Sequence, residues 1–217
     1  MAIGKRKQVD AIEASRGENR GASSVRGELG ERLRSVRRKR GWTLDQASKA
    51  TGVARSTLSK IENGAMSPTF DLIQKLAQGL AVDLVQFFGG GAVGGAPGRR
   101  SLMLTNDGPV LDNGTYAHAL LASDLSKKRM LPFLSRVKAR SLSDFTEMNR
   151  HQGDVFLYVI NGEIEFYSEY YSSVKLSSGQ SIYFDGQMEH ALVSISPDNA
   201  EVLWVCDNWS GQSDLEG

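Results

Sequence analysis

Between residues 29 and 88, apolar side chains recur every three to four positions, which is the period of short amphipathic helices. The period predicts four such helices and a fifth from Val82 to Phe88. The positions expected to face inward are Leu29, Leu33 and Val36, then Leu44, Ala47 and Ala50, then Leu58 and Ile61, and finally Phe70, Ile73, Leu76, Ala77 and Leu80. Five short helices can share one small core, so this part of the chain is expected to form an all-α domain.

The second and third predicted helices have clear boundaries. Thr43 followed by Gln46 is a capping-box pattern, which places a helix start just after Thr43. Gly52 ends that helix, and after a short turn the next helix runs over residues 54–62. Two short helices joined by a tight, glycine-containing turn are typical of the helix-turn-helix, whose second helix enters the major groove of DNA. An ordinary helical hairpin has the same spacing and is the alternative interpretation.

Beyond residue 100 the period changes from helical to alternating, which is typical of β-strands. The strand-like runs are 101–105, 116–121, 131–139, 155–160, 163–167, 172–176, 181–184, 191–195 and 202–205. Between two of the runs, Asn161-Gly162 is predicted to form a hairpin turn. Many short strands with regular turns indicate a sandwich or barrel. The expected fold class is therefore multidomain α plus β, with an all-α domain followed by an all-β domain.

Glycine content marks the boundary between the two predicted domains. Residues 89–98 read GGGAVGGAPG, a composition typical of a flexible linker. The first 28 residues lack a sustained apolar period and are rich in Arg, Gly and Ser, so a disordered basic arm is expected there. The predicted organisation is an arm at 1–28, a helix-turn-helix domain at 29–88, a linker at 89–100, a β domain at 101–210 and a tail at 211–217.

The net charge of +1 conceals a strong asymmetry between the two parts of the chain. Residues 1–88 hold 16 Lys plus Arg against 9 Asp plus Glu, whereas residues 101–217 hold 8 against 16. This difference indicates a module that faces nucleic acid joined to one that does not, with a merely solvated basic face as the alternative. The single cysteine, Cys206, lies in the apolar run VLWVC, which favours a buried thiol in a reducing compartment.

Residues 29–88 resemble the five-helix DNA-binding domain of the xenobiotic-response-element (XRE) family, which is related to the lambdoid phage repressors and Cro. In that family a buried salt bridge joins the first and third helices, and Arg37 and Glu62 match this pair. Two exposed charges are the alternative. Ser48 replaces the usual alanine at the helix crossing, and Ala54 replaces the usual Ser or Thr cap. Both residues are small, so the resemblance still implies the family's fold.

The resemblance also implies which side chains serve DNA binding. The positions that face base edges are matched by Arg55, Ser56, Ser59 and Lys60. Arg55 is the first candidate for direct readout, because an arginine can donate two parallel hydrogen bonds to guanine O6 and N7. The positions that hold the phosphate backbone are matched by Thr43, Gln46 and Asn63, and Arg37 completes the set of residues assigned to DNA binding.

Two segments of the predicted β domain, residues 151–166 and 179–193, resemble the two motifs of the cupins. Cupins are small barrels of the jelly-roll kind whose interior often holds a metal or a small ligand. His151 matches a histidine of the first motif, and His190 matches the histidine of the second. The resemblance therefore implies a barrel with both histidines near its interior.

The positions that bind metal in catalytic cupins are altered in this chain. Asn149 stands where the first ligating histidine belongs, and Val155 stands where the glutamate ligand belongs. The neighbouring Asp154 is expected to point to the other side of the sheet, because side chains alternate along a strand. A working non-haem iron site needs two histidines and a carboxylate. No metal is assigned, and a divalent ion held by His151 and His190 is the weaker alternative.

The candidate contacts for a small organic ligand are His151, His190, Asn149 and Tyr158. For the two histidines the alternative is a polar core, and for Tyr158 it is an ordinarily packed tyrosine. His118 has no motif to support a role.

An XRE-type helix-turn-helix, a glycine-rich linker and a cupin together resemble a group of bacterial transcription regulators in which the barrel senses a small molecule. The resemblance implies a homodimer, paired through the cupin domains, that reads a pseudo-palindromic double-stranded DNA operator and responds to an unknown effector. No apolar run has the length of a membrane span and no secretory signal is visible, so a cytoplasmic protein without a membrane partner is expected. Two alternatives stay open: a cupin metalloenzyme of the dioxygenase type that carries a DNA-binding domain, and an antitoxin-like DNA-binding partner.

Overall fold

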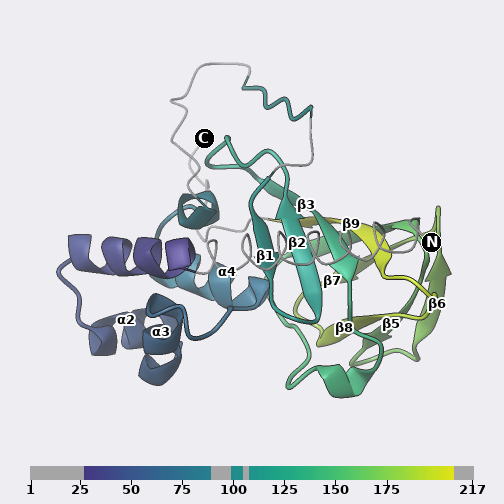
Figure 1. Ribbon diagram of the computed structural model, residues 1–217, viewed down its shortest axis with the longest axis horizontal. Helices are drawn as coiled ribbons and strands as arrows, with labels where there is room; N and C mark the ends of the chain where they lie inside the picture. Colours follow the sequence, from purple (N-terminus) through teal and green to yellow (C-terminus); the bar gives the residue numbers. More distant parts are fainter. Residues whose placement is uncertain (1–26, 89–98, 105–107, 208–217) are drawn as a thin grey trace, which may run out of the picture.

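The computed structural model describes residues 27–88, 99–104 and 108–207 (Figure 1). These residues form a group of helices followed by a β-barrel, which confirms the expected order of an all-α and an all-β part. The predicted tail, all but the last two residues of the predicted arm and all but the last two of the predicted linker lie outside the described residues.

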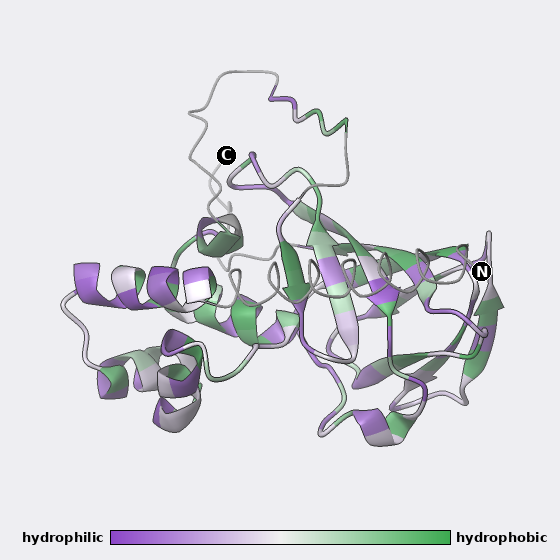
Figure 2. Cartoon of the chain, viewed as in Figure 1, coloured by the Kyte–Doolittle hydropathy of each residue, from purple (hydrophilic) through white to green (hydrophobic). Residues whose placement is uncertain are grey.

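The helical part follows the apolar period closely. Residues 27–39 are helical, and the next elements are α2 (Leu44–Thr51), α3 (Arg55–Glu62), α4 (Phe70–Gly79) and a 3₁₀ helix, η1 (Leu84–Phe88). The predicted fifth helix is therefore a short 3₁₀ helix. In Figure 2 the helix over residues 27–39 is mostly hydrophilic on its visible side, whereas α4 carries apolar residues toward the barrel. No helix among the described residues is both long enough and apolar enough to cross a bilayer.

One inward position of α2 was predicted wrongly. Ala50 is exposed, and the neighbouring Thr51 is buried in its place. The hydroxyl of Thr51 donates to the carbonyl of Ala47 at 2.8 Å and accepts from the amide of Val53 at 3.2 Å. Because these two bonds satisfy the hydroxyl inside the protein, a polar residue is stable at a position that hydrophobicity alone would assign to the surface.

The barrel contains nine strands within the described residues. Their bounds are β1 Val110–Asp112, β2 Tyr116–Leu120, β3 Met130–Val137, β4 Asp154–Asn161, β5 Glu163–Ser168, β6 Val174–Ser177, β7 Ser181–Asp185, β8 His190–Ser194 and β9 Ala200–Asp207. Eight of the predicted runs correspond to β2 through β9. The run predicted at 101–105 is not a strand in its described residues, and the short β1 was missed. With three residues, β1 is too short to show an alternating pattern.

The strands form two antiparallel sheets, one in the order β1-β2-β3-β9-β4-β7 and the other in the order β6-β5-β8. Residues on the inner faces of the strands are buried, and residues on the outer faces alternate with them, as in β9, where Val202, Trp204 and Cys206 face inward. This is the two-layer arrangement that a cupin jelly roll requires.

The predicted hairpin at Asn161-Gly162 is wrong, although the turn itself is present. Strand β4 pairs with β7 and β9, whereas β5 pairs with β6 and β8, so the two strands flanking Gly162 belong to different sheets. The register of β4 against β9 shifts between Val159 and Asn161. A shift of this kind bends a strand, and here the chain turns a corner from one sheet into the other.

Candidate functional site

The first candidate site is the exposed face of α3. Arg55 lies at the start of this helix with 67% of its side chain exposed, and its guanidinium is 3.4 Å from the carboxylate of the equally exposed Asp45. Ser56 and Lys60 are exposed and Ser59 is partly exposed, while Leu58 and Ile61 face the core. The four residues predicted to face base edges therefore lie on one helix and point away from the core.

A buried ion-pair network holds the other end of α3. The carboxylate of Glu62 accepts hydrogen bonds from Arg37 at 2.6 and 2.8 Å and from Arg34 at 3.3 Å. Burial disfavours the charged form of Glu62, but the hydrogen bonds and charges of the two arginines outweigh it, so the pKa of Glu62 is lowered from its usual value. The predicted Arg37 to Glu62 salt bridge is confirmed, and Arg34 is an additional partner that the sequence comparison did not identify.

The guanidinium of Arg37 is engaged within the protein, where it helps to position α3, and its predicted part in DNA binding stays a prediction. Its side chain is 12% exposed, and its third nitrogen donates to the carbonyl of Trp42 at 2.7 Å. Nearby, a Cβ on Gly30 would lie 2.4 Å from the carbonyl oxygen of Ile61. Only glycine allows the first helix to lie this close to α3.

The three residues expected at the phosphate backbone are all exposed. Thr43 and Gln46 form the predicted capping box, with hydrogen bonds of 2.8 and 3.2 Å between their side chains and backbone amides. Asn63 accepts a hydrogen bond from Arg34 at 2.5 Å and donates one to Ser59 at 3.4 Å. Ala54 stands at the position of the family's usual Ser or Thr cap, and α3 accordingly starts without a side-chain cap.

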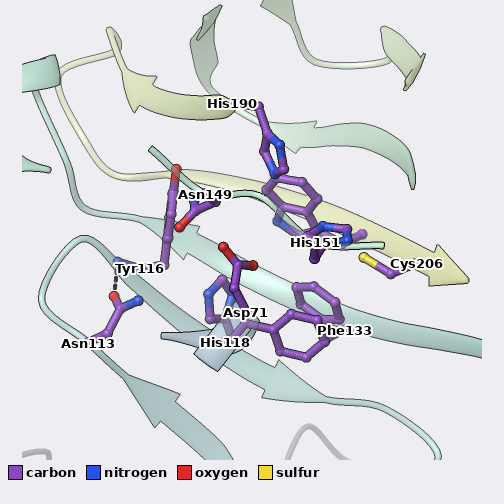
Figure 3. A pocket seen from close by; sticks show the side chains of 11 residues that line it. Asp71, Asn113, Tyr116, His118, Phe133, Asn149, His151, His190 and Cys206 are labelled. Carbon is purple, nitrogen blue, oxygen red and sulfur yellow. Dashed lines mark hydrogen bonds between the residues drawn. The ribbon is translucent and has the colours of Figure 1, made fainter. Parts of the chain in front are cut away.

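The second candidate site is a cavity in the barrel, with a volume of about 320 Å³ counted out to its open mouth. It contains all three histidines of the chain. The lining residues are Phe70, Asp71, Asn113, Tyr116, His118, Phe133, Asn149, His151, His190, Trp204 and Cys206 (Figure 3). Of the predicted ligand contacts, Asn149, His151 and His190 are brought together here.

His151 and His190 lie edge to face, with their ring centroids 5.3 Å apart. The Nδ1 of His190 is 2.8 Å from the carbonyl oxygen of Met188. A carbonyl can only accept, so the neutral ring carries its proton on Nδ1 and presents Nε2 as an acceptor. Burial, with a smaller contribution from the neighbouring His151, lowers the pKa of His190 to about 4, although the Met188 hydrogen bond and the charge of Asp71 oppose the shift. His190 is therefore uncharged at neutral pH.

The position of His151 depends on a glycine in the second motif. A Cβ on Gly186 would lie 2.5 Å from Cε1 of His151, so a larger residue would push the ring away. The amide of His151 donates to the carbonyl of Gly186 at 2.9 Å. His190 and Asn149 are joined in the same way by two backbone hydrogen bonds of 2.9 Å. Backbone pairing thus fixes these three side chains at one end of the barrel.

Two lining residues, His118 and Tyr116, were not assigned from the sequence. His118 lies in β2 with its Nδ1 2.6 Å from the hydroxyl of Ser135, and burial lowers its pKa to about 3. The Tyr116 hydroxyl bonds to the backbone of Leu192 at 2.8 and 3.2 Å, and burial raises its pKa. The alternation in β2 placed both side chains on one face. The sequence did not show that this face of β2 lines the cavity.

Trp204 and Cys206 on β9 complete the inner wall. Trp204 is only 4% exposed, and its buried Nε1 has no hydrogen-bond partner within the part of the chain that the structure describes. Cys206 is a buried free thiol, as predicted, and burial raises its pKa. The cavity therefore offers an N–H donor that only an additional group can satisfy.

Tyr158 was predicted wrongly as a ligand contact. It lies on the outer face of β4 with 38% of its surface exposed, because Val155, Leu157 and Val159 take the inner positions of the same strand. Asp154 is exposed on that outer face too, as the alternation predicted.

The side chains at the cupin metal positions do not fit a metal ion. Only His151 and His190 offer ligand atoms, Val155 is a buried hydrocarbon, and Asn149 contributes an amide. Across residues 27–88, 99–104 and 108–207, no group of three or more His, Cys, Asp or Glu side chains is arranged to hold a metal. No step through a metal is derived for this protein.

The mouth of the cavity is formed by the helical part of the chain. Phe70 and Asp71, the first two residues of α4, belong to its lining, and Figure 3 shows the Asp71 carboxylate pointing in between Asn149 and His118. The sequence predicted an inward position for Phe70, as part of the helical core, and assigned no role to Asp71. Nothing in the local pattern indicated that α4 reaches the barrel.

Comparisons with known proteins agree with both domains. Residues 33–87 match the helix-turn-helix family model, and residues 143–206 match the cupin domain model. The fold thus defines a two-domain protein with a helix-turn-helix domain followed by a cupin barrel. The chain combines an XRE-type helix-turn-helix domain with a C-terminal cupin domain.

Individual relatives cover different shares of the chain. The HTH-type transcriptional regulator SutR of Escherichia coli (strain K12) is 39% identical over 59 residues, which are 27% of this chain and 33% of the relative. The match thus spans about a third of that protein's length. A crystal structure of an HTH_3 family transcriptional regulator from Vibrio cholerae has a TM-score of 0.56 at 18% identity, over 85% of this chain and 98% of that one, which shows a shared fold. Hydroxypropylphosphonic acid epoxidase from S. wedmorenis has a TM-score of 0.46 at 20% identity, over 83% and 97% of the two chains.

Proposed function

We propose that this protein is a cytoplasmic, sequence-specific DNA-binding transcriptional regulator whose cupin domain binds a small-molecule effector. The observation that carries the proposal is the geometry of α3. Its outward face presents Arg55, Ser56, Ser59 and Lys60, and the Glu62 network anchors its far end to the first helix. A short helix with polar outward residues on a rigid support is what reading of the major groove requires.

The regulator acts as a homodimer in this proposal, because a single recognition helix buries too little surface for high specificity. Two copies would place their α3 helices about 34 Å apart and read a pseudo-palindromic operator. The dimer is supported by an apolar surface on the outside of the six-stranded sheet, called here the outer face. Its residues are Met130, Pro132, Leu134, Phe156, Tyr158, Ile160, Tyr183, Leu203 and Val205.

The outer face is continuous across four strands. Phe156 pairs with Tyr183 on β7 and with Val205 on β9, and Val205 pairs with Pro132 on β3. Tyr183 is 65% exposed and Phe156 is 39% exposed. Apolar patches of this extent mark interaction sites on soluble proteins. Pairing through this surface leaves α3 accessible, since α3 belongs to the helical part of the chain.

The effector site in this proposal is the histidine-lined cavity, with His151, His190 and Asn149 as polar contacts. The Nε2 of His190 offers an acceptor, and the buried Nε1 of Trp204 offers a donor that has no partner among the described residues. A site with a few polar groups in an aromatic wall suits a small polar organic molecule.

The test of DNA recognition starts with the sequences that the protein binds in cells, recovered by immunoprecipitation and sequencing. Arg55→Ala is expected to weaken binding to the recovered operator by about 1 to 3 kcal/mol, while binding to random DNA changes little. Arg129→Ala removes an exposed arginine from the cupin domain and is the matched control, with both affinities unchanged. Equal binding of operator and random DNA by the parent protein would reject the proposed function.

A further inference from the structure

The N-terminal end of α4 docks onto the mouth of the barrel through an apolar contact. The ring of Phe70 lies 4.6 Å from that of Phe133 and 6.1 Å from that of His118, both on the inner face of the barrel. Only 6% of Phe70 is exposed. A residue of the DNA-binding domain is therefore packed inside the cupin domain.

Three hydrogen bonds surround this contact and come from three separate segments of the helical domain. The Asp71 carboxylate accepts from the amide of Arg150 at 2.9 Å, and the hydroxyl of Ser67 donates to the carbonyl of Asp112 at 2.6 Å. The amide of Lys127 donates to the carboxylate of Asp83. Together with Phe70, these bonds define one placement of the helix-turn-helix relative to the barrel.

In this placement the cavity is too small for an organic effector. Within the envelope of about 320 Å³, the space left for the centre of a water-sized particle is about 20 Å³. Sites for organic ligands have volumes on the order of 300 to 1,000 Å³. Trp204 nevertheless presents a buried N–H without a partner among the described residues. The docked arrangement therefore leaves too little room for an organic ligand in a cavity whose wall carries polar groups.

We propose that the N-terminal end of α4 is the gate of the barrel, so that an effector enters only when Phe70 and Asp71 leave the mouth and the DNA-binding head undocks. The effector's part in this inference rests on the proposed function. Since the effector binds only the undocked form, each effector molecule bound shifts the population of head placements. Because α3 and α4 both pack against α2 in one domain, the signal passes without any torque through the glycine-rich linker.

Cys206 provides a reporter of the gate that needs neither effector nor DNA. It is the only cysteine of the chain, it lines the cavity, and it is 1% exposed in the docked form. The rate at which a small methanethiosulfonate reagent modifies Cys206 in the full chain, followed by mass spectrometry, therefore reports how often the cavity opens. Phe70→Ala and Asp71→Ala are each expected to raise this rate by about tenfold or more.

Lys75→Ala, on the exposed side of the same helix, is the control and should react as the parent does. Amide hydrogen exchange at Leu157, buried in β4, measures global opening of the barrel in every variant. An unchanged thiol rate in both gate variants would overturn the proposal. A thiol rate that changes only in parallel with Leu157 exchange would overturn it too, because global opening of the barrel would then explain the reaction. Asp71→Ala keeps the test valid if Phe70→Ala does not fold.

A second measurement tests the coupling to DNA. Affinity for the recovered operator should differ by about fivefold or more between Asp71→Ala and Lys75→Ala, the lower end of known allosteric couplings. Equal affinities combined with a faster thiol reaction would overturn the regulatory role of the gate. If the parent binds no specific DNA, the proposed function fails, while the thiol rates still decide whether α4 closes the barrel.

Discussion

A single residue, Glu62, anchors the end of α3 to the first helix. Its carboxylate is 4% exposed and receives three hydrogen bonds from two arginines. Removing one partner of such a pair leaves the other charge buried without compensation, which costs more than the pair itself contributes. Glu62→Gln is therefore expected to reduce the free energy of unfolding by about 3 kcal/mol.

The effect of Glu62→Gln should depend on pH with a definite sign. The folded-state pKa of Glu62 lies below its unfolded value, so the stabilisation is complete above about pH 4.5 and is lost as the pH falls through the folded pKa. Urea unfolding of parent and variant at pH 7 and pH 3 measures this difference. Glu28→Gln removes an exposed partner of Arg32 and is the control, with an expected change below about 0.5 kcal/mol. A difference that grows toward low pH would contradict the assignment.

Prediction from the sequence succeeded for residues whose role depends on near neighbours or on a family pattern, such as Glu62 and the Thr43 cap. It failed for Tyr158 and did not identify His118 or Asp71 as lining residues. Whether a side chain on a strand faces a cavity depends on the neighbouring sheet, and both faces of β4 carry apolar residues, so its sequence alone does not show which face points inward. Asp71 lines the cavity only because α4 docks on the barrel.

At the scale of elements, α2 and α3 begin in different ways. The hydroxyl of Thr43 accepts from the amide of Gln46 at 3.2 Å, whereas Ala54 offers no side-chain acceptor at the start of α3. Thr43→Ala should lower the free energy of unfolding by about 1 kcal/mol, and Ala54→Ser should raise it by about 0.5 to 1 kcal/mol. Urea unfolding measures both changes. Destabilisation by Ala54→Ser would show that a serine side chain cannot reach the first amides of α3.

The corner at Gly162 joins the two sheets, and it is tighter than a hairpin turn. Its φ is +81°, and a Cβ would lie 2.7 Å from the hydroxyl oxygen of Ser196 and 3.1 Å from Ala200. Gly114 has a similar φ of +95° but has open space around it. Both positions suffer backbone strain with alanine, and only Gly162 adds a steric clash.

Gly162→Ala should therefore destabilise the protein by about 2 to 3 kcal/mol and Gly114→Ala by about 1 kcal/mol. Thermal or urea unfolding of the two variants gives the comparison directly. Equal losses would mean that Ser196 and Ala200 move aside at little cost, and that the corner is less constrained than its geometry indicates.

At the scale of the whole molecule, the outer face is the surface on which the proposed dimer depends. Tyr183→Glu places a charge on this apolar surface, on the edge strand β7. It should raise the dissociation constant of the dimer by about 30-fold, which corresponds to about 2 kcal/mol, and weaken operator binding with it. Sedimentation velocity over a concentration series measures the first effect.

Tyr171→Glu is the matched control for the dimer, because Tyr171 is 71% exposed in the segment between β5 and β6 and lies outside the outer face. It should leave both the oligomeric state and DNA binding unchanged. A dimer that tolerates Tyr183→Glu as well as it tolerates Tyr171→Glu would place the subunit contact elsewhere.

The sequence by itself determined the two domains, the helix-turn-helix with its capping box and its Arg37 to Glu62 pair, and the strands that surround His151 and His190. These features arise from periods, caps and motifs that act over short distances along the chain. Only the tertiary structure decided that Tyr158 faces outward, that Gly162 is a corner, and that the end of α4 lines the cavity. Asp71, His118 and Trp204 meet there from segments far apart in the sequence. Which of them come together depends on how sheets cross and domains dock, and no local pattern encodes that.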